Sequence, residues 1–190
     1  MIPSSYQVPY FMFNCCMPVY IPLCYDGHSY RYPTQPPYTT HANEFHTPFP
    51  QAAITDYGPS PFVVNIDEAT KQNNTFRTAL WTGKYFQLTL MSLESGEDIG
   101  LEMHPDVDQF IRIEAGEGLV QMGDRMEQLD FERKVYDDYA LIIPAGKWHN
   151  LTNTGTQPLK LYSIYAPPQH PFGTIHETKE ISQAAEYHNE

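Results

Sequence analysis

Residues 96–116 read GEDIGLEMHPDVDQFIRIEAG, and residues 144–153 read PAGKWHNLTN. In an extended strand, residues two apart point to the same face, so Glu102 and His104 of the first stretch share one side. The second stretch is a turn that delivers His149 to the start of another strand. A carboxylate and imidazoles on the inner face of a barrel are costly to bury unless something pairs with them. Together with the amide oxygen of Gln109, these side chains form the donor set of a transition-metal site.

From residue 62 onward the chain has the pattern of a β protein. Short runs of alternating or β-branched residues recur, separated by turn residues, and they cover residues 76–81, 85–93, 99–104, 109–115, 118–122, 139–143, 148–153 and 159–166. Many short strands spaced by about 8–12 residues indicate a sandwich or a barrel rather than alternating strands and helices. Two short helices are predicted, over residues 67–72 and 179–187. The sequence therefore predicts an all-β fold.

Through the two quoted stretches, the chain resembles the cupin superfamily. The first cupin motif has a glycine, a His-x-His pair, a glutamate and a glycine, and its spacing falls on Gly96, Glu102, His104, Gln109 and Gly116. The second has a glycine, Pro-x-Gly, a histidine and an asparagine, and its spacing falls on Asp138, Pro144, Gly146, His149 and Asn153. Both motifs agree in order, over about residues 76–166. The resemblance implies a double-stranded β-helix, or jelly-roll, barrel.

The same resemblance implies a divalent metal ion inside the barrel, with Glu102, His104, Gln109 and His149 as its ligands. Glu102 stands where histidine is usual and Gln109 where glutamate is usual, so the ligand charge stays at about −1. This charge suits Fe(II), Mn(II), Ni(II) or Zn(II), and the oxygen-rich donors favour iron or manganese. The alternative is a barrel that has lost its metal and uses the polar cluster to bind a sugar or binds nothing there.

Catalytic groups are expected beside these ligands. Tyr162 and Tyr165 lie on the last predicted barrel strand with opposite parity, so one of them faces the pocket. We predict that this residue is Tyr165, whose phenol serves as an acid, a base or a hydrogen-bond partner of the substrate. Glu102 is the second predicted catalytic group. His170 lies in a proline-rich stretch after the last strand, where we expect a surface or packing role.

The composition limits the classes of partner and compartment. The chain has 190 residues, 23 acidic against 11 basic side chains, and a formal net charge of −12. Nucleic-acid binding needs a basic face, and an acidic surface is repelled by anionic membranes. No apolar run approaches the ~18 residues that span a bilayer, and the N-terminal stretch lacks the features of a secretory signal. The 3 cysteines indicate free thiols in a reducing compartment, so we expect a cytoplasmic protein.

The first third of the chain differs from the rest. Up to residue 62 it holds eleven of the 17 prolines, eight of the 14 tyrosines and all 3 cysteines, with four charged side chains. Dense proline excludes long helices and central strands. We predict an extended arm over residues 1–61, which is either poorly ordered or laid over the barrel or a neighbouring subunit. A barrel over residues 62–170 and a tail with a short helix over 171–190 complete the predicted organisation.

The predicted function is that of a metal-binding barrel acting on a polar small molecule, such as a sugar or an organic acid, by isomerase, epimerase or lyase chemistry. With iron bound, the open positions would admit O₂ and the protein would act as a dioxygenase. Two alternatives are not enzymes: a ligand-binding module, and a structural protein of the spore-coat type that assembles through the arm. We expect a homodimer or larger homo-oligomer formed through the arm, and no nucleic-acid or membrane partner.

Overall fold

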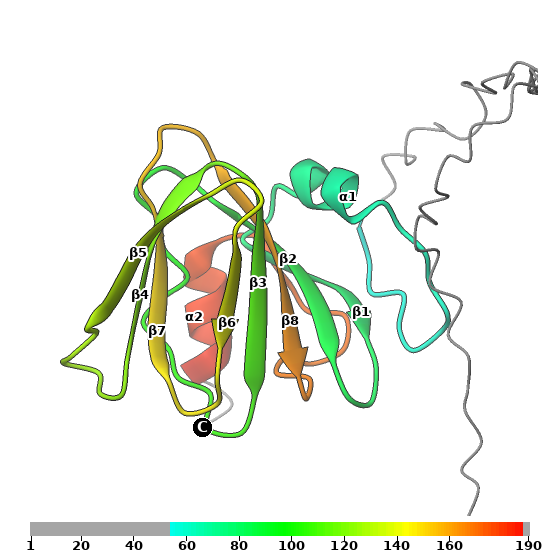
Figure 1. Ribbon diagram of the computed structural model, residues 1–190. Coiled ribbons are helices and arrows are strands. Elements are labelled where there is room, and N and C mark those ends of the chain that lie inside the picture. The colour runs from blue at the N-terminus through cyan, green and yellow to red at the C-terminus, as the bar shows by residue number, and fades with distance from the viewer. Residues whose placement is uncertain (1–53, 188–190) are drawn as a thin grey trace, which may run out of the picture. The chain divides into compact units, whose positions relative to one another are not determined.

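The computed structural model describes residues 54–187, so residues 1–53 of the predicted arm lie outside the described residues. Figure 1 shows the strands in two facing layers. The strands are β1 (Arg77–Thr82), β2 (Gln87–Leu93), β3 (Asp108–Ala115), β4 (Glu117–Gly123), β5 (Phe131–Tyr136), β6 (Ala140–Ile143), β7 (Trp148–Asn153), β8 (Leu159–Ala166) and β9 (Ile175–His176). The helices are α1 (Ile66–Gln72) and α2 (Lys179–Tyr187).

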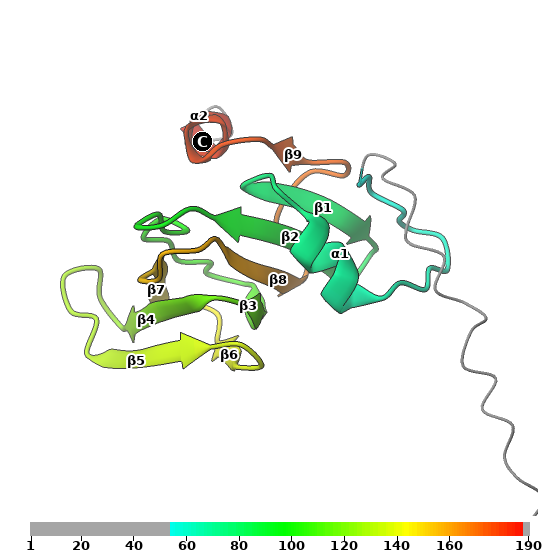
Figure 2. The ribbon, with the colours of Figure 1, turned by 90° about the horizontal axis from the view of Figure 1, so that it is seen from above.

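The strands form two antiparallel sheets. The larger sheet has the order β6-β3-β8-β2-β1-β9, and the smaller has the order β5-β4-β7. The chain before β3 extends the smaller sheet through two isolated bridges to β7, Asp98 with Thr152 and Glu102 with His149. Figure 2 shows α2 and β9 on one side of the barrel, with β5 and β6 on the opposite side. The predicted all-β barrel with a short C-terminal helix is confirmed.

The interior of the barrel changes character along the strands of the larger sheet. At one end the inward side chains of β2 and β8 are aliphatic, and they are Leu93, Met91, Leu159 and Leu161. At the other end the inward side chains of β2, β8 and β3 are polar or aromatic, and they are Thr89, Gln87, Ser163, Tyr165 and Gln109. Every residue of both sets is at most 2% exposed. We call these two halves the apolar end and the polar end.

The outer face of the larger sheet is covered by α1 and the chain before it. Asn65 begins α1 by accepting a hydrogen bond from the backbone N–H of Glu68 at 3.3 Å. Apolar residues of this region pack in one cluster with Leu80 of β1 and Leu90 of β2, and they are Ile54, Phe62, Val64, Ile66 and Ala69. The backbone N–H of Tyr57 also donates to the carbonyl of Leu80 at 2.9 Å. Contacts with the barrel therefore begin before residue 62.

One predicted strand is wrong, and two strands are missing from the prediction. Residues 99–104 form no continuous strand, because Gly100 has φ +94°, a left-handed conformation that interrupts extended backbone. β5 escapes prediction because only Val135 of its six residues is buried, so the alternation of apolar and polar residues is absent. β9 has two residues and no pattern of its own. The helices predicted over 67–72 and 179–187 are confirmed as α1 and α2, with α1 beginning one residue earlier.

No helix within residues 54–187 is long and apolar enough to cross a membrane.

Candidate metal centre

Backbone hydrogen bonds bring the two sequence motifs together at the polar end. Glu102 and His149 are paired directly: the N–H of Glu102 donates to the carbonyl of His149 at 3.0 Å, and the N–H of His149 donates to the carbonyl of Glu102 at 2.9 Å. Residues opposite each other in an antiparallel pair place their side chains on the same face. The carbonyl of His104 accepts from the N–H of Gly146 at 2.7 Å, which fixes the Pro-x-Gly turn against the first motif.

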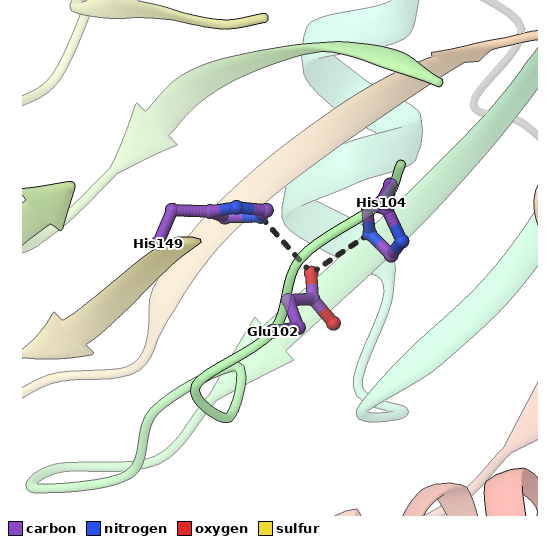
Figure 3. Close-up of side chains that lie close together, drawn as sticks. All are labelled: Glu102, His104 and His149. Atoms are coloured by element: carbon purple, nitrogen blue, oxygen red, sulfur yellow. Dashed lines mark ion pairs between the residues drawn. The ribbon is translucent and has the colours of Figure 1, made fainter. Parts of the chain in front are cut away.

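The side chains of Glu102, His104 and His149 converge on one point (Figure 3). Glu102 Oε1 lies 3.4 Å from His104 Nε2 and 3.3 Å from His149 Nε2. The side chain of His149 is 1% exposed and that of Glu102 is 16% exposed. One donor atom from each residue lies within 4.8 Å of the other two. We call these three residues the triad.

The triad has the hydrogen-bonding state of a set of metal ligands. His149 Nδ1 lies 2.9 Å from the carbonyl oxygen of Lys147, and because a carbonyl oxygen only accepts, Nδ1 carries the proton. In the neutral ring Nε2 then presents a lone pair to Glu102 Oε1, which is another acceptor. Within the described residues, Glu102 Oε1, His104 Nε2 and His149 Nε2 form no hydrogen bond. Close contacts between these atoms need a positive charge between them, either a proton on an imidazole or a metal ion, and two imidazoles with one carboxylate fit a divalent transition-metal ion.

Arg77 of β1 supports Glu102 from the other side. Its guanidinium Nη2 lies 4.0 Å from Glu102 Oε2, and its Nη1 donates to the hydroxyl of Ser182 at 2.8 Å. Burial by itself raises the pKa of Glu102, but His104, His149 and Arg77 together outweigh burial and hold that pKa well below its ordinary value. Glu102 is therefore an anion at neutral pH, as a carboxylate ligand must be.

The structure places the other predicted site residues near the triad. Tyr165 is 0% exposed, and its ring meets the ring of His104 edge-on at 5.7 Å between centroids. Gln109 pairs with Tyr165 across β3 and β8, so the two share the inner face. Gln109 Nε2 donates to the hydroxyl of Ser163 at 3.0 Å, and Gln109 Oε1 forms no hydrogen bond to any described residue. The assignment of Gln109 as a ligand and of Tyr165 and Glu102 as catalytic groups stays a prediction.

Sequence reasoning missed Arg77 at this site, and it predicted a surface or packing role for His170 without identifying its partners. Arg77 stands alone among apolar neighbours in a predicted strand, and this isolated inward charge was the available signal. His170 packs edge-on against Tyr165 at 5.0 Å, and its backbone N–H and carbonyl are both bound by the side chain of Gln87, each at 2.9 Å. Burial lowers the pKa of His170 well below its usual value, so its ring is neutral at neutral pH. No local sequence pattern predicts the contacts of His170 with Tyr165 and Gln87.

A second acidic group, formed by Glu114, Asp137 and Asp138, is a weaker candidate for a metal site. Arg112 Nε lies 2.9 Å from Glu114 Oε1, and Arg112 Nη2 also pairs with Asp138. Asp137 and Asp138 are exposed. An ion-pair network accounts for this group, and it has no imidazole ligand.

A groove of about 610 Å³ lies along β4, β5 and β6, and none of the triad residues lines it. Met122 of the groove is paired across the sheet with His149, so the groove and the triad are neighbours within the barrel. The potential metal ligands lie at the triad and not in the groove.

Comparisons with known proteins agree with this fold. The family description "Cupin domain" matches residues 89–165. The uncharacterized protein YrkC of Bacillus subtilis (strain 168) is 71% identical over 133 residues, which are 70% of this chain and 72% of YrkC. The uncharacterized protein L612 of Acanthamoeba polyphaga mimivirus is 43% identical over 115 residues, which are 60% of this chain and 70% of L612. The crystal structure of BH2720 from Bacillus halodurans has a TM-score of 0.69 and 66% identity, covering 69% of this chain and 99% of BH2720. The chain therefore belongs to the cupin family.

Proposed function

We propose that the protein binds one divalent transition-metal ion at the polar end through Glu102, His104 and His149, and acts there on a small organic acid or a sugar. The observation that carries this proposal is the convergence of three potential ligand atoms, one from each residue, within 4.8 Å, and none of them makes a hydrogen bond among residues 54–187. Buried acceptors that face one another destabilise a fold unless a cation joins them. The same three residues stand at ligand positions of the two cupin motifs.

Gln109 is the proposed fourth ligand. Gln109 Nε2 donates a hydrogen bond to the hydroxyl of Ser163, whereas the buried Oε1 has no hydrogen bond in the described part of the chain. An amide oxygen in this state is a neutral ligand, and oxygen donors beside two imidazoles favour Fe(II) or Mn(II) over Ni(II) or Zn(II).

The chain supplies groups for proton transfer around this ion. A bound divalent ion would supply Lewis-acid polarisation of a substrate oxygen. Tyr165, fully buried beside His104, would hold or transfer a substrate proton in isomerase, epimerase or lyase chemistry. Glu102 is the second predicted catalytic group, and because its pKa is held well below the ordinary value it would act as an anionic ligand rather than as a base. Oxygen uptake by the iron-loaded protein, measured against anaerobic turnover, tests whether it is instead a dioxygenase.

The charges at the polar end favour an organic acid over a neutral sugar. Arg77 lies 4.0 Å from Glu102 Oε2 and adds positive charge beside it. Glu102 is the one carboxylate of the proposed ligand set and Gln109 is neutral, so these ligands would offset only part of the double charge of a bound ion. A buried charge without a partner is unfavourable, and a carboxylate ligand would neutralise it.

Elemental analysis of full-length protein purified without added metal tests the proposal. The wild type should carry close to one transition-metal ion per chain, with iron or manganese predominant. His149→Ala should lose most of it, because removing one of three or four convergent ligands weakens affinity by several kcal/mol, or about a hundredfold or more. Tyr85→Ala is the control, since it also removes an aromatic ring but at a position that is 73% exposed and outside the triad, and it should keep the metal.

Glu102→Gln is the sharper companion because it keeps the shape of the side chain and removes its charge. It should bind metal more weakly than wild type and should melt at a lower temperature only when metal is present. Wild-type metal content and wild-type melting in both His149→Ala and Glu102→Gln would show that the triad is not a metal site.

A further inference from the structure

We propose that helix α2 is a positioning element of the metal centre, acting on Glu102 through Ser182 and Arg77. The inference rests on the metal site proposed above, and it assigns part of that site's affinity to residues that contact no metal ion. Arg77 lies at the start of the barrel and Ser182 in the last helix, 105 residues apart.

Arg77 is the central link of this connection. It is the largest of the fully buried side chains among the described residues, at 1% exposed, and it pairs with the inward-facing Met91 of β2. Burying a guanidinium is costly, so its orientation must be set by fixed partners. One fork of the guanidinium donates to Ser182 Oγ at 2.8 Å, and the other faces Glu102 Oε2 at 4.0 Å. The position of Ser182 therefore sets where the positive charge lies relative to Glu102.

A second attachment joins α2 to the chain segment that carries Glu102. Lys179 Nζ lies 2.7 Å from Asp98 Oδ1, and this oxygen also accepts the backbone N–H of Gly100 at 2.6 Å. Asp98 is bridged to Thr152 of β7, in the same way that Glu102 is bridged to His149. Helix α2, on the side of the barrel away from β5 and β6 (Figure 2), thus fixes the segment from Asp98 to Glu102 at both ends.

The two oxygens of Glu102 have separate partners, and this makes the orientation matter. Oε1 faces the two imidazoles (Figure 3), whereas Oε2 faces Arg77. A cation that holds Oε2 keeps Oε1 aimed at the imidazoles, which is the role of an outer-shell partner in metal sites. Serine at position 182 supports this reading, because alanine forms helices better and would suit a 2% exposed helix position if packing were the only demand.

Mn(II) binding by metal-free, full-length variants tests the proposal, with free Mn(II) measured by electron paramagnetic resonance. Ser182→Ala and Arg77→Lys should each bind Mn(II) about 10–100-fold more weakly than wild type, the usual effect of losing an outer-shell partner. Ser182→Thr keeps the hydroxyl and should restore affinity close to wild type. Ser95→Ala is the matched control, because the hydroxyl of Ser95 is exposed and donates to the carbonyl of Gly155 at 2.6 Å, far from the triad in the fold.

A purely structural role for Ser182 makes a different prediction. It would lower the melting temperature of the metal-free protein and leave the visible absorption of the Co(II)-loaded protein unchanged, whereas a positioning role changes the absorption of bound Co(II). Wild-type Mn(II) affinity in folded Ser182→Ala would overturn the inference and leave the metal site standing. Should Ser182→Ala not fold, wild-type affinity in Arg77→Lys would overturn it equally. A wild type that binds neither Mn(II) nor Co(II) would remove the metal site and this inference together.

Discussion

The apolar end and the polar end of the barrel are built from the same strands and differ in what they bury. Along the inner face of β8, Leu159 and Leu161 are followed by Ser163 and Tyr165, all 0% exposed. The backbone hydrogen bonds of the ladder continue through both halves, so the strands themselves need no polar side chains at either end. The change from aliphatic to polar residues therefore serves something other than the sheet.

The two ends also differ in the hydrogen bonding of their buried amide side chains. At the apolar end, Asn153 is 1% exposed and fully used: its Nδ2 donates to the carbonyls of Leu93 and Gln157, and its Oδ1 accepts the N–H of Gly155, each at 2.9 Å. At the polar end, Gln109 is equally buried, but its Oε1 has no partner in the part of the chain that the structure describes. A satisfied buried amide stabilises the fold, whereas an unsatisfied one needs a ligand, an ion or a water molecule as its partner.

The largest effect on stability is expected from a substitution at the apolar end. Leu161→Ala should lower the free energy of unfolding by about 2–5 kcal/mol, because it removes a fully buried side chain and leaves a cavity. Urea denaturation of metal-free protein measures this change. Ile142→Ala, at a residue that is 66% exposed, should change it by less than about 0.5 kcal/mol.

The same variant tests whether the two ends are independent. Leu161→Ala should still bind close to one metal ion per folded chain, because the triad lies at the other end of the strands. Loss of metal from folded Leu161→Ala would contradict the division of the barrel into a stabilising end and a binding end.

A smaller effect on the free energy of unfolding is expected at Asp56, which joins Gly173 to the end of β1 at Thr82. Its carboxylate accepts the N–H of Gly173 at 3.0 Å and the hydroxyl of Thr82 at 2.5 Å. Burial by itself raises the pKa of Asp56, but these hydrogen bonds outweigh burial and lower it below its ordinary value. Its stabilisation is therefore present above the pKa of the unfolded chain and is lost as the pH falls through the lower pKa of the folded state.

Asp56→Asn should accordingly lower the free energy of unfolding at pH 7 by about 1 kcal/mol, a modest value because the carboxylate is partly exposed to solvent. The difference from wild type should shrink as the pH falls below about 4. Denaturation curves at pH 7 and pH 3.5 measure both values, with Asp106→Asn in an exposed turn as the control. A difference that grows toward low pH would contradict the assigned sign.

The sequence predicts the parts of this molecule that depend on local spacing. Alternation places β7 and β8 at their observed bounds, and the two motifs identify Glu102, His104 and His149. The hydrogen bond between Arg77 and Ser182 joins residues 105 positions apart, and the one between Gln87 and His170 joins residues 83 positions apart. No local sequence pattern around these residues predicts either contact. The interruption of the 99–104 strand at Gly100 depends on a backbone angle that glycine permits and does not require.

The smallest effect on stability is expected at Thr89, and it is the sharpest test of the contrast between the two ends. Thr89 is 0% exposed, and its hydroxyl has no hydrogen-bond partner among residues 54–187. Removing a buried polar group that lacks a partner releases its desolvation penalty, so Thr89→Val should change the free energy of unfolding by less than about 0.5 kcal/mol or increase it slightly. Urea denaturation of metal-free Thr89→Val beside wild type measures this. A loss above about 1 kcal/mol would show that the hydroxyl stabilises the fold, and the polar end would then be, at this position, as structural as the apolar end.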